Sequence, residues 1–394
     1  MDDLIYLDNA ATAWPKPDSV YQFMIDNYRR LGVNPGRSGF DLAIEAGNIV
    51  EDLRLRLTKF FGGDEDAPER LCFGYNATDA LNLIIQGTLS PGDHVVTTNL
   101  EHNSVIRPIN HLVRDAGVEA TFVPFDHRGF VDPDEIKAAI RRNTKLVIVN
   151  HGSNVLGTVQ PVAEIGKICR ERDIIFAIDS SQTAGVIPID MKEMNIDVLA
   201  FTGHKALMGC TGIGGLCVRK GIEIRQTRSG GTGVNSAHPY HLEEYPFRME
   251  FGTPNMVGIA SLMAGQDWID DTGIENIRAH EIRLARKLVK GFREIDGVIV
   301  YCCNQMDNHL STVTVNVEGM DAGNVGIMLD AEHNIATRTG LHCAPLVHKQ
   351  IGTLELHGSV RFSIGAFNTD QHMNAAIEAM VEIAKQVHEL SMRR

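Results

Sequence analysis

The sequence lacks several features that would place the protein in a membrane or outside the cell. No apolar run approaches the roughly 18 residues of a membrane span, and the N-terminus has neither the basic start nor the apolar core of a signal peptide. We therefore expect a cytoplasmic protein. The seven cysteines form an odd set without paired CxxC spacing, so we expect neither a disulfide framework nor a metal site. Internal repeats and low-complexity linkers are also absent.

Positive charge is also in short supply. The 37 basic residues are outnumbered by 50 acidic ones, which gives a formal net charge of −13. This balance argues against nucleic acid or an anionic membrane as the main partner, and favours a small-molecule ligand. At 394 residues, with 43% hydrophobic content, the chain exceeds the usual single domain of about 100–200 residues, so two domains are expected.

Short apolar runs alternate with helical patterns between residues 71 and 201, and an amphipathic helix is predicted over 42–61. This alternation predicts an α/β fold with a mainly parallel sheet and helices on both faces. After about residue 258, a long helical stretch (258–294) and short strands near 298–301, 312–317 and 359–364 predict a smaller α+β domain, joined by the N-terminal segment.

Several polar residues come just after the predicted strands. Ligands of such sheets bind beyond the carboxyl ends of the strands, so these side chains are expected to converge on one site. The set comprises Asn76, Glu101, His102, Asn154, Asp179, His204 and Lys205.

Asp179 ends one apolar run, and Lys205 follows another within a few residues and precedes a predicted glycine-containing loop over 209–215. A pyridoxal phosphate enzyme needs this pair, because the carboxylate meets the pyridinium nitrogen and the amine forms a Schiff base. Each residue has a simpler reading when taken singly: Asp179 as the cap of a turn, and Lys205 as a solvated surface residue.

Other residues fit the same ligand less specifically. The segment 74–79 lies between a strand and a helix, so its amides and the Thr78 hydroxyl would face an anion. Considered alone, this stretch fits a simple helix cap equally well. His102 is placed to stack on an aromatic ring and relay protons, and Gln182 to reach the phenolic oxygen of that ring. Taken alone, Gln182 reads as an ordinary polar loop residue.

A last cluster surrounds Cys343. This cysteine lies in a loop bounded by Gly340 and Pro345, near Arg338 and His342, and nearby cations favour the reactive thiolate. Arg361 follows in an otherwise apolar strand, which suggests a guanidinium kept for a substrate carboxylate. An inert loop cysteine and an internal salt bridge are the alternatives.

Taken together, these residues resemble the class V aminotransferase group of fold type I pyridoxal phosphate enzymes, and within it the cysteine desulfurase and selenocysteine lyase family. The resemblance spans nearly the whole chain and is carried by four motifs: Tyr-Leu-Asp-Asn-Ala-Ala-Thr at 6–12, Gly-His-Lys at 203–205, Glu-Phe-Gly-Thr-Pro-Asn at 250–255 and Arg-Thr-Gly-Leu-His-Cys at 338–343. It implies a large domain over 15–257 with a mainly parallel seven-stranded sheet. Residues 1–14 and 258–394 would form the small α+β domain.

The resemblance also implies a role for individual residues toward pyridoxal 5′-phosphate. Lys205 would carry the cofactor as a Schiff base, Asp179 would pair with the pyridinium, and His102 would stack on the ring. The remaining cofactor contacts would come from Gln182, Ala77, Thr78, His204, Asn154 and, from the second subunit of a homodimer with shared active sites, Thr253.

For the substrate, the resemblance implies that Arg361 binds the carboxylate, together with Arg338 and Asn154, and that Arg37 reaches across the dimer interface. Cys343 would accept the sulfur and pass it to an acceptor protein. The short stretch from Cys343 to Arg361 resembles the SufS-like group rather than the IscS-like group. Ala77 and Leu341 depart from the family pattern, which has a hydroxyl residue and a histidine, respectively, at these places.

The expected reaction converts cysteine to alanine and leaves a persulfide on Cys343. Lys205 removes the Cα proton, and the Cys343 thiolate attacks the substrate sulfur. Two alternative enzyme functions are a selenocysteine or selenocystine lyase and a class V aminotransferase, although an aminotransferase gives Cys343 no role. A non-enzymatic alternative is a catalytically silent scaffold that binds pyridoxal phosphate.

Overall fold

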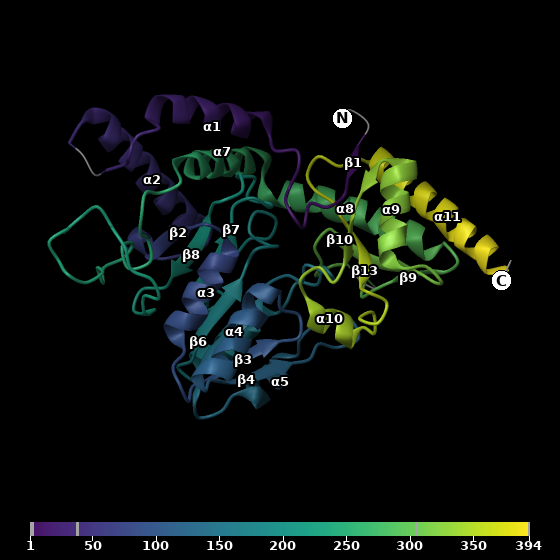
Figure 1. Ribbon diagram of the computed structural model, residues 1–394, viewed down its shortest axis with the longest axis horizontal. Helices are drawn as coiled ribbons and strands as arrows, with labels where there is room; N and C mark the ends of the chain where they lie inside the picture. Colours follow the sequence, from purple (N-terminus) through teal and green to yellow (C-terminus); the bar gives the residue numbers. More distant parts are fainter. Residues whose placement is uncertain (1–3, 37–38, 304–305, 393–394) are drawn as a thin grey trace.

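The computed structural model describes residues 4–36, 39–303 and 306–392. Its centre is a seven-stranded sheet with the strand order β2-β8-β7-β6-β5-β3-β4 (Figure 1). Only β8 runs antiparallel to its neighbours, so the predicted mainly parallel seven-stranded sheet is confirmed. The strands are β2 (Leu71–Gly74), β3 (His94–Thr98), β4 (Glu119–Val123), β5 (Thr144–Asn150), β6 (Ile175–Asp179), β7 (Val198–Thr202) and β8 (Gly214–Val218).

Helices cover both faces of this sheet. Successive strand residues point to opposite faces. In β5, Leu146 and Ile148 pack with α3 (Ala77–Thr88) and α4 (Asn103–Ala116). Val147 and Val149 instead join a core with the helices of the other face, and the sheet is therefore buried on both sides. Those helices are α2 (Asp41–Phe60), α5 (Pro133–Ala139), α6 (Val162–Arg170) and α7 (Met256–Thr272); α1 (Asp18–Leu31) packs along α7, and a short 3₁₀ turn spans Pro68–Arg70.

A smaller sheet follows in the C-terminal part, with the order β12-β13-β10-β9. Its own apolar core also takes in Leu7 from the N-terminal segment, whose strand β1 (Ile5–Tyr6) pairs with β11 (Ile335–Ala336). The domain boundary at residue 257 stays a prediction. The other elements here are α8 (Ile274–Arg293), β9 (Val298–Val300), β10 (Thr312–Val317), α9 (Ala322–His333), β12 (Arg338–Gly340), α10 (Pro345–Gln350), β13 (Ser359–Ser363) and α11 (Asp370–Met392).

The structure differs from the sequence predictions at two glycine-containing places. The stretch 258–294 is not one helix, because Gly273, with φ of +84°, separates α7 from α8. Residues 214–215, predicted as part of a loop, instead begin strand β8, where a Cβ on Gly215 would clash with the Cys72 carbonyl of β2. The strand therefore needs glycine for close packing rather than for a turn.

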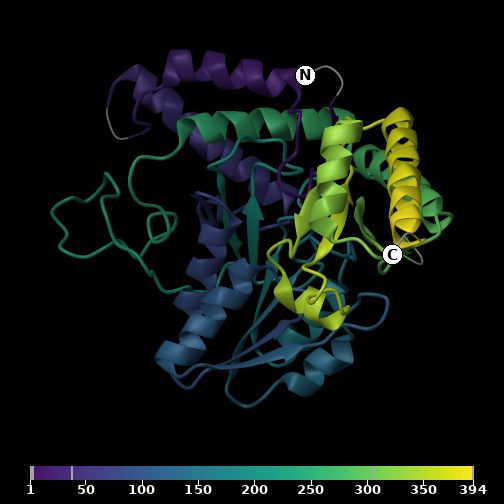
Figure 2. The same ribbon diagram turned by 45° about the vertical axis from the view of Figure 1, so that its right-hand side comes forward.

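Figure 2 shows the long connection between β8 and α7, residues 219–255, projecting from the body of the molecule. None of the helices in the described part of the chain combines the length and the apolar character needed to cross a membrane.

Candidate active site

One cavity at the carboxyl ends of the large-sheet strands brings most of the predicted site residues together. Its volume is about 260 Å³. The predicted residues that line it are Asn76, Ala77, Thr78, His102, Asn154, Asp179, Gln182, His204, Lys205, Arg338 and Arg361, whereas Glu101 and Cys343 lie beside it without lining it. The convergence expected from the strand ends is therefore present in a single chain.

Lys205 and Asp179 define the floor of this cavity. Burial lowers the pKa of Lys205 to about 8, while the charge of Asp179 opposes the shift. Asp179 ends β6 and is 6% exposed, and its Oδ1 accepts hydrogen bonds from the amide and hydroxyl of Ser181. The site thus holds a partly neutral amine beside a fixed carboxylate.

The N-terminal segment fixes the backbone next to Lys205. The carbonyl of His204 accepts three hydrogen bonds, from the Ala13 amide at 3.2 Å, the Thr12 hydroxyl at 3.0 Å and the Lys16 amine at 2.6 Å. Burial also lowers the pKa of Lys16 to about 8. Three donors on one carbonyl leave the peptide before Lys205 little freedom to rotate.

His102 lies before α4 and caps this helix through its ring. Nδ1 accepts a hydrogen bond from the Ser104 amide at 3.1 Å. Burial lowers the pKa of His102 to about 4, so the ring is neutral near pH 7. The adjacent Glu101 is fully buried, accepts from the Thr98 hydroxyl at 2.7 Å and the Asn150 amide at 3.0 Å, and has its pKa raised by burial to about 8.

The first turn of α3 forms the end of the cavity predicted to bind phosphate. Asn76 caps the helix by accepting from the Asp79 amide at 3.0 Å. Ala77 and Thr78 begin the helix and line the cavity, so its positive end faces the space above Lys205. The helix cap read from the sequence is therefore present at Asn76, and the anion-binding role of Thr78 stays a prediction.

The polar atoms of the cavity fit a polar ligand such as pyridoxal phosphate. Within the described residues, five buried atoms of its lining residues have no hydrogen-bond partner: Asn150 Oδ1, Asn154 Oδ1, Thr202 Oγ1, His204 Nδ1 and Arg361 Nε. Unpaired buried polar atoms are costly, and a ligand with several polar groups relieves that cost. The amine, the carboxylate and the helix N-terminus supply the three partners that an aldehyde, a ring nitrogen and a phosphate need.

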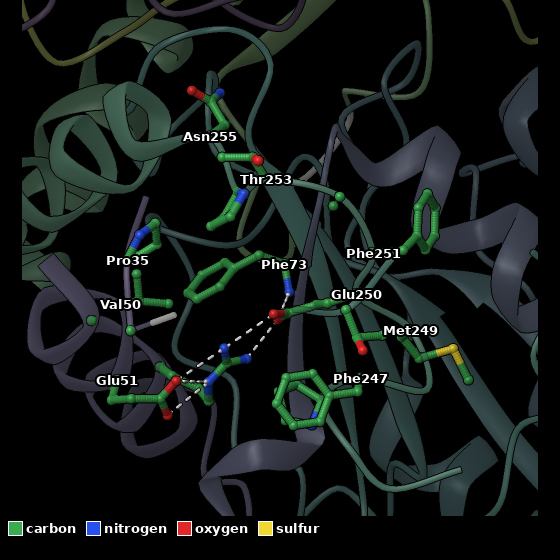
Figure 3. A pocket seen from close by; sticks show the side chains of 18 of the residues that line it. Pro35, Val50, Glu51, Phe73, Phe247, Met249, Glu250, Phe251, Thr253 and Asn255 are labelled. Carbon is green, nitrogen blue, oxygen red and sulfur yellow. Dashed lines mark hydrogen bonds and ion pairs between the residues drawn. The ribbon is translucent and has the colours of Figure 1, made fainter. Parts of the chain in front are cut away.

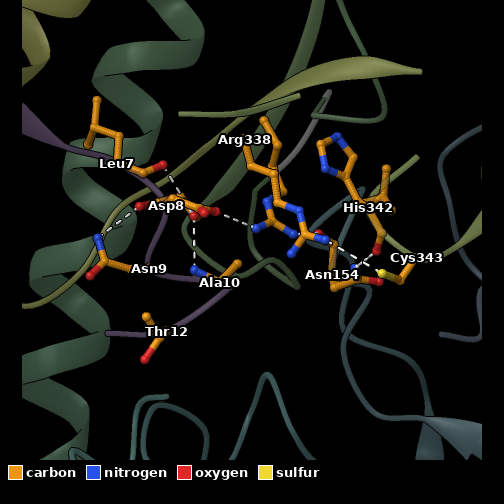
Figure 4. A network of polar contacts seen from close by, with 12 residues as sticks. Leu7, Asp8, Asn9, Ala10, Thr12, Asn154, Arg338, His342 and Cys343 are labelled. Atoms are coloured by element: carbon orange, nitrogen blue, oxygen red, sulfur yellow. Dashed lines mark hydrogen bonds and ion pairs between the residues drawn. The ribbon is translucent and has the colours of Figure 1, made fainter. Parts of the chain in front are cut away.

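Two guanidinium groups form the side of the cavity nearer the small sheet (Figure 4). Arg338 of β12 and Arg361 of β13 are directly opposite each other in the antiparallel pair. Arg361 is 1% exposed, donates to Asp8 Oδ1 at 2.6 Å and to the Asn154 carbonyl at 3.0 Å, and keeps Nε unpaired. Arg338 has no carboxylate within ion-pair distance among the described residues. Adjacent like charges repel, so this arrangement favours an anionic ligand.

Cys343 lies beside Arg338, with its Sγ 3.5 Å from Nη2 of the guanidinium. His342 and Cys343 both adopt the left-handed backbone conformation, with φ of +47° and +58°. Asn154 Nδ2 donates to the His342 carbonyl and the Asn103 amide donates to the Cys343 carbonyl, each at 2.7 Å. These two bonds attach the thiol-bearing loop to a loop and a helix of the large sheet, and Figure 4 shows Asn154 next to this loop.

Thr253 does not line the Lys205 cavity; it lies in a second cavity of about 600 Å³ between α2 and the end of the 219–255 connection (Figure 3). There, buried Arg54 binds Glu250, whose Oε1 also accepts from the Phe73 amide of edge strand β2 at 2.7 Å. Arg37 lies outside the described residues.

Sequence reasoning missed three residues of the site. Asp8 belongs to the N-terminal motif, but its partner Arg361 lies 353 positions away. Ser181 orients Asp179, and Ser104 contacts both His102 and Thr78. The position of Ser104, two residues after His102 at a helix start, was the available signal.

Comparison with known proteins gives consistent results. The family model described as aminotransferase class-V matches residues 5–375. A probable cysteine desulfurase of Methanothermobacter thermautotrophicus is 33% identical, covering 97% of this chain and 95% of its own. The apo structure of a cysteine desulfurase from Thermococcus onnurineus NA1 matches with a TM-score of 0.87 at 32% identity, over 98% of this chain and 96% of that one. The cysteine desulfurase CsdA from Escherichia coli matches with a TM-score of 0.86 at 25% identity, over 99% and 96%.

Proposed function

The chain belongs to the class V aminotransferase family, and we propose that it is a pyridoxal phosphate-dependent cysteine desulfurase that transfers sulfur from free cysteine to Cys343. The observation that carries the proposal is the place of this thiol. It lies 3.5 Å from the guanidinium of Arg338, which lines the same cavity as Lys205 and Asp179. An aminotransferase needs no thiol there, whereas sulfur transfer does.

Pyridoxal phosphate, when bound, supplies an aldehyde for the substrate amine and a ring that accepts electrons from the substrate carbon. We assign Lys205 to the aldehyde, Asp179 to the ring nitrogen and His102 to the ring face. The phosphate would lie at the start of α3, near Ala77, Thr78 and His204, and Gln182 would contact the ring oxygen. Gln182 Nε2 donates to the Ala10 carbonyl at 3.0 Å, which holds its side chain at the cavity.

Three residues of the chain bind the substrate and move its proton. Arg361, held by Asp8 and the Asn154 carbonyl, binds the substrate carboxylate with its remaining donors, and Arg338 adds a second cation. The neutral form of the Lys205 amine takes the Cα proton, and its pKa of about 8 makes that form accessible.

Cys343 performs the sulfur transfer. Its thiolate attacks the substrate sulfur, so an S–S bond forms while the C–S bond breaks. The electron pair of the C–S bond stays with the carbon, which is protonated to give alanine. One cysteine and one thiol thus yield one alanine and one persulfide, and no external oxidant is needed.

A single-turnover experiment tests this assignment. The holoprotein is incubated with L-cysteine in the absence of reductant, and products are measured by mass spectrometry of the protein and by amino-acid analysis. We expect equal amounts of alanine and of persulfide on Cys343. Formation of a keto acid instead of alanine would favour an aminotransferase. Parallel assays with cystine, selenocysteine and selenocystine, in both L and D forms, test the preference for sulfur or selenium.

We also propose a homodimer with shared active sites. Tyr21, Ile25 and Tyr28 form an exposed apolar stripe on α1, and an apolar cavity borders Thr253 on the same side of the sheet as α2. Apolar surface of this extent favours a protein partner. If Thr253 serves the other subunit, a mixed dimer of K205A and T253A chains contains one site with both residues intact and binds cofactor there.

The proposal also includes an acceptor protein for the sulfur and a location in the cell. The half-buried Cys343 would pass its sulfur to an acceptor protein, which must reach the loop between β12 and α10. A cytoplasmic location also stays a prediction.

A further inference from the structure

Ser104 is a buried residue for which the proposed mechanism has no task. It is the second residue of α4, is 7% exposed, and lines the Lys205 cavity. Its hydroxyl lies 3.0 Å from the Thr78 hydroxyl and 2.5 Å from Nδ1 of His102. It therefore joins the end of the cavity assigned to phosphate with the residue assigned to the ring.

The place of this hydroxyl matters because residue 77 has none. Ala77 and Thr78 open α3, and both line the cavity. A phosphate at a helix N-terminus gains from each hydroxyl or amide that donates to it. Ser104 comes from a different helix, yet its Oγ is within hydrogen-bond distance of Thr78 Oγ1. The cavity thus has a second hydroxyl beside Thr78 despite the alanine at 77.

The bonds to His102 define which ring nitrogen carries hydrogen. The Ser104 amide can only donate, so Nδ1 must accept. The ring is neutral near pH 7, because burial lowers its pKa to about 4. A neutral imidazole carries one hydrogen, which must then be on Nε2. Protonation of Nδ1 would also break the cap of α4.

We propose that Ser104 is a further residue of the cofactor-phosphate site, that its hydroxyl replaces the one missing at residue 77, and that its amide holds His102 with its hydrogen on Nε2. The hydroxyl has one hydrogen, which Nδ1 accepts in the absence of phosphate; with phosphate bound, this hydrogen turns to the phosphate and the Ser104 amide alone donates to Nδ1. Ser104 is on this account a binding and positioning residue. The proposal rests on the proposed function, since it assumes that the cavity binds pyridoxal phosphate.

Cofactor titration of the apoprotein tests the phosphate role. Pyridoxal phosphate and pyridoxal, which lacks the phosphate, are titrated separately and followed by absorbance. We expect S104A to weaken binding of pyridoxal phosphate by about ten-fold, the loss of one charge-assisted hydrogen bond, and to leave pyridoxal binding nearly unchanged. S236A, at an exposed serine, is the matched control and should bind both as the wild type does.

The double variant A77S/S104A provides the decisive comparison. It returns a hydroxyl to the α3 turn, so we expect its affinity for pyridoxal phosphate to recover to within about three-fold of the wild type. Recovery also shows that S104A had not simply misfolded. An unrecovered double variant, an S104A protein with wild-type affinity, or equal weakening for both ligands would each refute the phosphate role.

Nitrogen NMR of histidine-labelled apoprotein tests the tautomer, with the His102 signals assigned from H102Q. We expect an unprotonated Nδ1 and a protonated Nε2 at pH 7 in the wild type; the reverse would overturn this part. The proposed function fails separately, if the wild-type protein binds neither pyridoxal phosphate nor pyridoxal.

Discussion

Two walls of different construction face each other across the Lys205 cavity. We call Thr78, His102, Asp179 and Lys205 the large-sheet wall, and Arg338 and Arg361, with Cys343 in contact with Arg338, the small-sheet wall. The first is built at the carboxyl ends of mainly parallel strands and nearby helix starts, and burial keeps His102 and part of the Lys205 population uncharged. The second comes from an antiparallel pair and carries two opposed guanidinium groups.

This difference separates two kinds of binding. Converging strand ends and a helix start suit one rigid ligand with a ring and a phosphate, because their groups have fixed positions. Two cations beside a thiol suit a small anion that must enter and leave. The comparison supports the proposed placement of the cofactor at the large-sheet wall and of the substrate at the small-sheet wall.

The largest effect should come from K205A, which removes the amine of the large-sheet wall. We expect turnover to fall by about 10⁴-fold or more, since this group both holds the cofactor and moves the Cα proton. Borohydride reduction of the wild-type holoprotein followed by peptide mapping should place the label on Lys205. K220A, at an exposed lysine, should keep the label and the activity. A label on another lysine would break the assignment of the large-sheet wall.

C343A tests the small-sheet wall while leaving the large-sheet wall unchanged. We expect cofactor absorbance and its change on adding cysteine to stay as in the wild type, while persulfide formation is lost and alanine production falls by about 100-fold or more. The matched control is C302A, a half-buried cysteine whose pKa burial raises to about 11. Full desulfuration of cysteine by C343A would contradict the role of this thiol.

D8N tests how the small-sheet wall is held. Asp8 forms a 2.6 Å ion pair with Arg361, and its loss should leave the guanidinium less firmly oriented. We expect KM for cysteine to rise by about ten-fold with a smaller change in kcat, and cofactor affinity to stay constant. D18N, at an exposed aspartate in the first turn of α1, controls for charge. A drop in kcat alone would place Asp8 in the chemistry instead.

The last prediction concerns stability rather than turnover, at Glu281 of α8, which shares a small cavity with Lys205 and Gln182. It accepts from the Ser311 hydroxyl at 2.9 Å, and burial raises its pKa from 4.5 to about 8. The folded state therefore keeps a proton that the unfolded state loses above about pH 4.5, so stability falls as pH rises from there to 8.

We expect E281Q to remove this decline, which amounts to on the order of 2 kcal/mol. Urea unfolding at pH 5 and pH 8 measures it, and E275Q, at an exposed position on the same helix, should behave as the wild type does. If the free energy of unfolding depends on pH in the same way in the wild type and in E281Q, Glu281 ionises without cost and its cavity is open to water.

The two walls were not equally predictable from sequence. Asp179 and Lys205 follow apolar runs, and the rule that strand ends converge brings them together without further information. Asp8 and Ser104 could not be assigned this way, because their roles depend on contacts with Arg361 and Thr78 that are far away in the chain. The family resemblance covered Arg338 and Cys343, but their 3.5 Å contact needed coordinates.

The fold shows the same limit. The strand and helix alternation from 71 to 201 followed from hydrophobic periodicity, and the structure confirms it. Strand β8 could not be predicted from hydrophobic periodicity, because Gly214 and Gly215 are typical of a loop. Close packing against β2 explains why glycine stands in this strand. The break at Gly273 likewise interrupts a pattern that remains helical on both sides.

The bonds from Asn103 and Asn154 to the peptides at 342 and 343 have a consequence for delivery of the product. An outward movement of the loop that carries the Cys343 persulfide would break both hydrogen bonds, at a cost of about 1 kcal/mol each. It would also leave the Asn103 amide at the start of α4 without its carbonyl partner. Under the proposed function, we therefore expect the receiving nucleophile to come to Cys343 in its place, so that access to the loop between β12 and α10, rather than motion of this loop, limits the transfer of sulfur.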